Sequence, residues 1–201
     1  AEIAAWRHKN YENLTIHVGN LNDMNITRKF DYVTLIGVLE YAGSFTHTSD
    51  PYKDFLQACR QYLKPGGQLI IAIENKFGLK YWSGAREDHT GKIFDSITGY
   101  KGNDKVRTFS KPELEKLLYD SGFENLTWYY PFPDYKLPHR LYSDEYLPTA
   151  GVFEDKHFIY YDMERYVLFN EADAMNEIVN SGLFDMFSNS FLVYCSNGEK
   201  E

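Results

Sequence analysis

Two short apolar runs separated by one helix constrain the fold of this chain more than any other feature. Residues 30–39 are rich in β-forming side chains and apolar on both faces, which is typical of a buried parallel strand. Residues 51–63 carry apolar side chains at helical spacing. Residues 64–67 (KPGG) then break the helix, and residues 68–73 form a second doubly apolar run. Strand, helix and strand in this order predict an α/β layer fold with a parallel sheet.

The segments on either side extend this pattern. Residues 14–18 alternate between apolar and polar side chains and predict an earlier strand. Further along, Ser110 is expected to cap a helix that ends at Gly122. We also predict a strand at residues 124–130, a loop at 131–148, a helix at 171–181 and a last strand at 190–195.

Composition limits the class of protein. The 201 residues suit one domain, and the hydrophobic fraction of 43% suits a folded chain. The net charge of −8 and the lack of basic clusters disfavour a nucleic acid as substrate or partner. No apolar run is long enough to cross a bilayer. Cys59 and Cys195 are expected to be buried free thiols. We therefore expect a cytoplasmic protein that does not bind membranes.

Two sequence motifs lie on either side of the helix predicted at residues 51–63. They are Phe30-Asp31-Tyr32-Val33-Thr34-Leu35-Ile36-Gly37-Val38-Leu39-Glu40-Tyr41 and Leu63-Lys64-Pro65-Gly66-Gly67-Gln68-Leu69-Ile70-Ile71. The pair resembles the middle of class I S-adenosylmethionine-dependent methyltransferases. The resemblance implies a Rossmann-like sheet in which these stretches supply strands four and five and the final strands form the closing antiparallel pair. It covers residues 1–201 as a single partial methyltransferase domain, with an aromatic and Pro-rich insertion at roughly 76–166.

The chain departs from the family where the cofactor is held. No G-x-G-x-x-G occurs, and the chain opens on what resembles the helix after strand two. The resemblance therefore implies an N-terminally truncated domain that lacks the first two strands, their Gly-rich loop and their ribose-binding acidic residue. We expect weak or absent S-adenosylmethionine binding by this chain alone. Without those strands, residues 14–18 should pair directly with residues 30–39, or the bare edge of residues 30–39 should form a homodimer.

The resemblance also places the cofactor residues. The segment near the adenine is Gly19, Asn20 and Leu21, with Asn20 where the family often has an acidic residue. The segment after strand four, beside the methionine part of the cofactor, comprises Gly37, Leu39, Glu40 and Tyr41. For Glu40, a role in capping the next element is an equally good interpretation.

His89 is the best candidate for a general base. Glu87 and Asp88 precede it, and an adjacent carboxylate can orient the ring and raise its basicity. A solvated polar loop is the alternative interpretation. Three consecutive side chains rarely point at one ion, so we expect no metal site from these residues.

Substrate-binding candidates lie at the end of the second apolar run and in the insertion. Glu74 and Asn75 fall on the rim where α/β sheets bind ligands. Asp134 and Lys136 could hold acceptor hydroxyls, or they could form an ion pair that fixes a Pro-rich loop. Aromatic side chains could wall the pocket or belong to the core. These aromatic candidates are Tyr41, Tyr81, Trp82 and Tyr100.

A narrower likeness concerns the acceptor. Three segments carry it, namely Ile73-Glu74-Asn75-Lys76-Phe77-Gly78-Leu79-Lys80-Tyr81, Glu87-Asp88-His89 and Tyr130-Pro131-Phe132-Pro133-Asp134-Tyr135-Lys136-Leu137-Pro138. They are similar to bacterial methyltransferase domains associated with surface-polysaccharide glycosyltransferases. This likeness implies O-methylation of a saccharide or nucleotide-linked sugar in polysaccharide biosynthesis. The alternative is a non-catalytic methyltransferase-like module that binds a glycosyltransferase or another protein partner.

Overall fold

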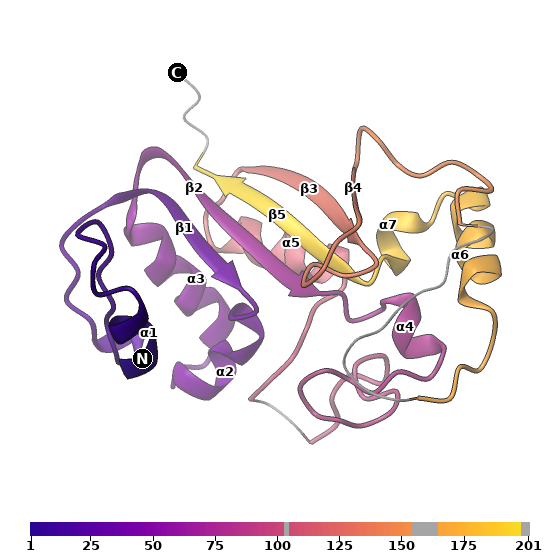
Figure 1. The fold of residues 1–201 in the computed structure, drawn as a ribbon, viewed down its shortest axis with the longest axis horizontal. Helices are drawn as coiled ribbons and strands as arrows, with labels where there is room; N and C mark the ends of the chain where they lie inside the picture. The colour runs from indigo at the N-terminus through magenta and orange to yellow at the C-terminus, as the bar shows by residue number, and fades with distance from the viewer. Residues whose placement is uncertain (103–104, 154–164, 198–201) are drawn as a thin grey trace.

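A five-stranded mixed sheet forms the centre of the computed structural model, which describes residues 1–102, 105–153 and 165–197 (Figure 1). The strand order is β1-β2-β5-β3-β4. β1 and β2 are parallel, whereas β5 is antiparallel to both β2 and β3, and β4 is antiparallel to β3. The bounds are β1 (Phe30–Ile36), β2 (Leu63–Glu74), β3 (Asn125–Phe132), β4 (Arg140–Ser143) and β5 (Ser190–Ser196). The expected parallel pair closed by antiparallel strands is confirmed.

Helices and short turns surround this sheet. The longer helices are α3 (Pro51–Gln61), α5 (Lys111–Asp120) and α6 (Glu171–Asn180). The shorter ones are α1 (Glu2–Arg7), α2 (Ala42–Phe45), α4 (Leu79–Trp82), α7 (Phe184–Phe187) and the 3₁₀ turns η1 (Leu21–Asp23) and η2 (Leu39–Tyr41). The helices expected at 51–63, 110–122 and 171–181 are therefore confirmed. Within the described ranges, none of the helices has the length and apolar character needed to cross a membrane.

The hydrophobic core lies on one face of the sheet. Leu69, Ile71 and Ile73 alternate along β2 and are fully buried. They join one apolar cluster with Leu56 of α3 and Leu114 of α5, two helices that pack against each other. The predicted burial of Cys59 and Cys195 is confirmed, and both belong to this cluster.

β1 differs from the doubly buried strand that its sequence predicts. Tyr32 and Ile36 are 62% and 51% exposed, and only Leu35 of this strand is buried. Among the described residues, β1 pairs with β2 alone, so it is an edge strand. Apolar side chains on both faces indicated burial, but burial also needs a neighbour on each side, which the described chain does not supply.

The strand predicted at residues 14–18 is wrong. These residues have no regular structure, and Val18 is 78% exposed. An alternating segment forms a strand only where another strand accepts its backbone hydrogen bonds. The predicted pairing of this segment with β1 is therefore absent from the described structure, while the open edge of β1 leaves the predicted homodimer untested.

Two smaller corrections concern turns. The loop predicted at residues 131–148 contains β4, which pairs with β3 from Tyr129 to Phe132. The prolines of this segment masked a short edge strand, a position where proline is tolerated. The predicted break at residues 64–67 lies inside β2, with Gly66 in the left-handed region at φ +72. The predicted insertion at 76–166 lies partly outside the described residues.

A reciprocal cap fixes the start of α5. The Ser110 side chain bonds the backbone at Glu113, whose carboxylate accepts from the Ser110 backbone N–H at 2.9 Å. We expect Ser110→Ala to lower the free energy of unfolding by about 1 kcal/mol, measured by urea denaturation, because one helix N–H loses its partner. Ser110→Thr should retain the cap and most of the stability. Equal stability of all three proteins would contradict this account of the cap.

The same cap predicts an acid-sensitive contribution to stability. Burial alone would raise the pKa of Glu113, but hydrogen bonds from the Ser110 backbone and Lys76 hold that pKa below its usual value. A lowered folded-state pKa stabilises the fold above the unfolded pKa of about 4.3, and this contribution is lost as the pH falls through the folded pKa. Urea midpoints measured on descending pH should therefore fall less steeply in Glu113→Gln than in the wild type. Parallel curves would refute the assignment.

Candidate active site

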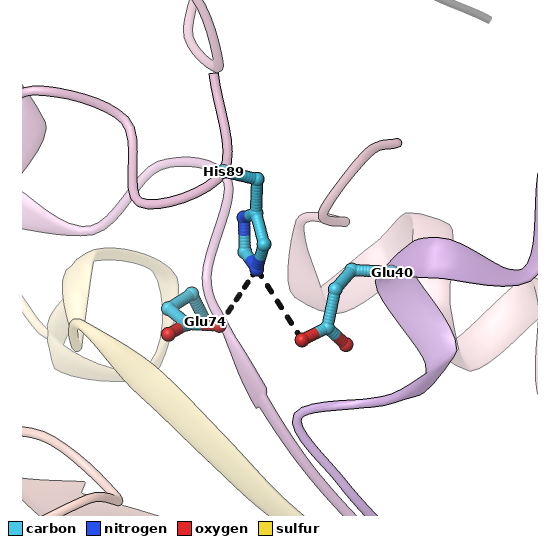
Figure 2. A group of neighbouring side chains, drawn as sticks. All are labelled: Glu40, Glu74 and His89. Atoms are coloured by element: carbon cyan, nitrogen blue, oxygen red, sulfur yellow. Dashed lines mark hydrogen bonds and ion pairs between the residues drawn. The ribbon is translucent and has the colours of Figure 1, made fainter. Parts of the chain in front are cut away.

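The carboxyl ends of β1 and β2 bring together residues that lie far apart in the sequence (Figure 2). Glu40 lies in η2, shortly after β1, and Glu74 is the last residue of β2. His89 comes from the loop after α4 and points between these two carboxylates. Its Nε2 lies 3.3 Å from Glu40 Oε1 and 3.8 Å from Glu74 Oε2. Parallel strands place their carboxyl ends at one edge, which explains the convergence of Glu40 and Glu74.

Glu87 orients the ring of His89 from the other side. The Nδ1 of His89 lies 2.8 Å from Glu87 Oε1, which also accepts a hydrogen bond from the Tyr100 hydroxyl at 3.0 Å. Glu87 Oε2 accepts the backbone N–H groups of His89 and Thr90. The loop is thus wound around one fully buried carboxylate, and the ring of Tyr41 contacts His89 edge-on. These contacts fix both the position and the plane of the imidazole.

The charge state of His89 follows from its neighbours. Burial would lower its pKa, but hydrogen bonds with Glu40 and Glu87 and the charge of Glu74 raise the pKa to about 10. For Glu87 the balance is reversed: burial would raise its pKa, and the contact with His89 lowers it. At neutral pH the ring therefore holds both protons. His89 can act as the predicted general base only after its Nε2 has lost this proton.

The two carboxylates that face His89 are poorly satisfied. Glu40 is 1% exposed and Glu74 is 0% exposed. Glu40 Oε2 and Glu74 Oε2 have no hydrogen-bond partner among the described residues. Burial, followed by the charge of Asp88, raises the pKa of Glu74 against the opposing effect of two lysines.

A network of buried ion pairs adjoins the cluster. Lys80 Nζ lies 2.8 Å from Asp88 and 3.1 Å from Asp134, and its side chain is only 4% exposed. Lys136 Nζ lies 2.9 Å from both Glu74 and Asp88. Burial would lower the pKa of Lys80, but Asp134 and Asp88 outweigh it and raise that pKa. Asp134 and Lys136 thus hold the loop at residues 133–136 against the site through separate partners rather than through an ion pair with each other, and Lys136 remains 39% exposed. Contact of either with substrate stays a prediction.

Two of the predicted substrate residues are engaged by the protein itself. The Asn75 amide donates to the carbonyls of Met186 and Ser188, and its carbonyl accepts from the Phe77 N–H. Tyr81 is fully buried and donates its hydroxyl to Asp88 at 2.5 Å. Both side chains support the walls of the site. Direct contact of either with substrate stays a prediction.

The first predicted cofactor segment is bound to the helix that follows the second one. The Asn20 side chain donates to the Phe45 carbonyl at 2.9 Å, which joins residues 19–21 to the helix that follows η2. Asn20 Oδ1 also accepts from the Asn22 N–H, so this side chain serves the local turn. Leu39 is fully buried, whereas Tyr41 is 37% exposed.

Gly37 is favoured by its left-handed backbone conformation. It has φ +63, and a Cβ at this position would lie 2.9 Å from the Tyr135 hydroxyl oxygen. Tyr135 is half-buried beside the cluster, and burial followed by the charges of Glu74 and Glu40 raises its pKa.

The sequence analysis missed Lys80 and Tyr135 as site residues. Both lie in segments that carry the narrower likeness, but nothing in the spacing of Lys80 or Tyr135, one of 17 tyrosines, pointed to a role in the site. Two hollows, of about 750 and 670 Å³, lie elsewhere. The larger is at the start of β2, at the opposite end of the strand from Glu74, and the smaller adjoins Gly84 and Phe94.

Comparisons with known proteins agree with this fold. A family model described as a methyltransferase domain matches residues 1–71. A candidate methyltransferase of Haloferax volcanii, solved in complex with a methyltransferase activator, is 17% identical over 98% of this chain and 67% of its own, with a TM-score of 0.50. The chain is also similar to an S-adenosylmethionine-dependent methyltransferase of Thermotoga maritima, a candidate histamine N-methyltransferase, with 15% identity over 98% of this chain and 70% of that one and a TM-score of 0.47. A third similar structure is an S-adenosylmethionine-dependent methyltransferase of Clostridium acetobutylicum, with 14% identity over 98% of this chain and 70% of that one and a TM-score of 0.46. No curated protein matches the chain. The chain has a Rossmann-like methyltransferase fold.

Lys80 should be essential to the stability of this region. Its removal leaves Asp88 and Asp134 buried without their shared cation. We expect Lys80→Met to lower the free energy of unfolding by about 3–5 kcal/mol, measured by urea denaturation. Lys116→Met is the matched control, because the Lys116 side chain is 75% exposed and its ion pair lies on the surface; it should leave the midpoint unchanged. A similar midpoint for both variants would show that the buried network does not stabilise the fold.

Proposed function

We propose that this protein transfers a methyl group from S-adenosylmethionine to a hydroxyl of a saccharide or nucleotide-linked sugar. The observation that carries the proposal is the cluster of Glu40, Glu74 and His89 at the carboxyl edge of two parallel strands. In α/β folds this edge is where ligands bind. The family match over residues 1–71 includes the first of these strands and most of the second.

The cofactor would contact two neighbouring segments. Residues 19–21 lie beside α2 through the Asn20–Phe45 hydrogen bond, and residues 37–41 lead from β1 into the cluster. The tight backbone at Gly37 keeps the end of β1 free of a side chain. Because the sequence holds no G-x-G-x-x-G, these segments would enclose the cofactor from one side only. We therefore propose weak binding of S-adenosylmethionine to this chain.

Methyl transfer requires that the methyl donor and the acceptor hydroxyl be aligned and that the hydroxyl lose its proton. The acceptor oxygen forms a bond to the methyl carbon while the bond between that carbon and sulfur breaks. The electron pair of the broken bond stays on sulfur. The hydroxyl proton must leave to a group in the site. His89, oriented by Glu87, can accept it once Nε2 is unprotonated. Lys136, which pairs with Glu74, and Asp134, which pairs with Lys80, could bind neighbouring hydroxyls of the acceptor.

The charge of the site favours a neutral sugar ring over a phosphate. Carboxylates outnumber lysines around His89, with Glu87 at 2.8 Å, Glu40 at 3.3 Å and Glu74 at 3.8 Å from its ring nitrogens. A phosphate placed in this cluster would meet like charge, whereas hydroxyl groups can donate to unpaired carboxylate oxygens. In a nucleotide-linked acceptor, the sugar would therefore enter the cluster and the phosphates would remain outside it.

Two measurements test the proposal. Calorimetric titration of S-adenosylhomocysteine should show weak saturable binding, and methyl-labelled S-adenosylmethionine should transfer label to a saccharide acceptor. His89→Asn should abolish transfer, whereas Glu145→Gln, on an exposed turn, should leave transfer unchanged. Absence of both binding and transfer would refute the enzyme. It would favour the alternative of a methyltransferase-like module, to be tested by binding to a glycosyltransferase.

A further inference from the structure

The cluster of Glu40, Glu74 and His89 contains more acceptor oxygens than its surroundings satisfy. Both carboxylates are at least 99% buried. Nε2 of His89 can carry one proton, yet it faces one oxygen of each carboxylate, at 3.3 and 3.8 Å. Glu40 Oε2 and Glu74 Oε2 have no hydrogen-bond partner within the described ranges. A buried ionised oxygen without a partner is costly. The arrangement is therefore incomplete without a further electropositive group.

We propose that Glu40, Glu74 and His89 bind a divalent cation of the Mn²⁺ or Zn²⁺ type. One ligand atom from each residue lies within 4.8 Å of the other two. A cation with bonds of about 2.0–2.2 Å spaces adjacent ligands by about 2.8–3.6 Å in octahedral or tetrahedral geometry. The separation of 3.3 Å between Nε2 and Glu40 already fits this range, and the 3.8 Å separation between Nε2 and Glu74 would have to shorten when the ion binds.

The surroundings of His89 are those of a metal ligand. Histidines that bind metals commonly donate their other ring N–H to a carboxylate, which fixes the tautomer and the plane of the ring. Glu87 occupies this position at 2.8 Å from Nδ1. Glu87 is held in turn by the Tyr100 hydroxyl and by two backbone N–H groups. Nε2 is thereby directed at Glu40 and Glu74, as Figure 2 shows.

The charge balance around the cluster also favours a cation. Lys80 and Lys136 pair with three carboxylates, namely Glu74, Asp88 and Asp134. Glu40 and Glu87 face His89 instead, so five carboxylates share two lysines and one imidazole. Within the part of the chain that the structure describes, Glu40 has its ion pair with His89. A doubly charged ion would offset the excess negative charge and satisfy several oxygens at once.

The ligand set indicates which ions fit. One imidazole nitrogen and two carboxylate oxygens lie between the preference of Zn²⁺ for nitrogen and that of Mn²⁺ for oxygen, while Mg²⁺ prefers oxygen alone. Three side chains leave coordination positions open for water or a substrate oxygen. Lys136 and Tyr41, at 39% and 37% exposure, border the cluster on its solvent side.

The role of the ion rests on the proposed methyl transfer, but its binding does not. A cation in the cluster would bind the acceptor hydroxyl and lower the pKa of that hydroxyl, whose proton would leave to solvent water. His89 would then act as a ligand rather than as the general base. Sequence reasoning considered only consecutive residues for a metal, and the fold instead supplies two carboxylates from other strands.

Electron paramagnetic resonance with Mn²⁺ tests the site without requiring catalysis. The whole chain is stripped of metal with a chelator, its folding is verified by circular dichroism, and MnCl₂ is added. We expect loss of the free-ion signal at one equivalent per chain, with micromolar affinity. Zn²⁺ should displace Mn²⁺, because Zn²⁺ binds such ligands more tightly, whereas Mg²⁺ should compete only weakly.

Variants locate the ion. Glu40→Gln and Glu74→Gln keep the side-chain shape and should each weaken Mn²⁺ binding by at least about tenfold. Glu87→Gln should weaken it by about 10–100-fold through His89. Glu145→Gln, an exposed carboxylate distant in sequence from the cluster, is the control and should bind Mn²⁺ like the wild type.

Two outcomes would overturn the proposal. One is a folded wild-type protein that binds neither Mn²⁺ nor Zn²⁺ saturably. The other is a Glu40→Gln/Glu74→Gln double variant that binds Mn²⁺ as tightly as the wild type. Neither result bears on S-adenosylhomocysteine binding, so failure of the metal site and failure of the proposed methyl transfer can be told apart.

Discussion

The parallel pairing of β1 with β2 is the constraint on which the site depends. The register places Ile36 opposite Ala72, so both strands end at the same edge. Glu40 and Glu74 follow these ends and are carried toward each other by the backbone alone. The buried side chains of β2 fix this register, because a slip of one residue would turn Leu69 and Ile71 away from the core. Packing of the core thus determines the spacing of the two carboxylates.

The segment after β2 contributes charged side chains to the site rather than apolar ones. Glu87 organises its loop through hydrogen bonds from the backbone of His89 and Thr90. Lys80 and Lys136 then bind the remaining carboxylates to β2 and to the loop around Asp134. Buried charges are tolerated only when they are paired. Pairing is incomplete at Glu40 and Glu74, where one oxygen of each carboxylate has no hydrogen-bond partner among the described residues.

The errors in the predicted fold share one physical cause. Side-chain alternation at residues 14–18 and the two apolar faces at residues 30–39 are local properties, whereas strand formation and burial depend on neighbours. Residues 14–18 lack a pairing strand in the described structure, and β1 lacks a second one. α5 was predicted correctly because its signals are local: Ser110 and Glu113 form a cap within one turn, and Leu114 and Leu118 lie on one helical face.

The sequence by itself determined the order of the elements, the parallel pair with its antiparallel closure, and the pairing of Glu87 with His89, which are two residues apart. It could not determine what faces the other side of that imidazole. Only the tertiary structure brings Glu40 and Glu74, which are 49 and 15 positions away from His89, within ion-pair distance of Nε2. The same holds for the contact between Lys80 and Asp134, which are 54 positions apart. Spacing along the chain specifies helices, caps and adjacent contacts, whereas charges that converge from different strands are specified by the sheet.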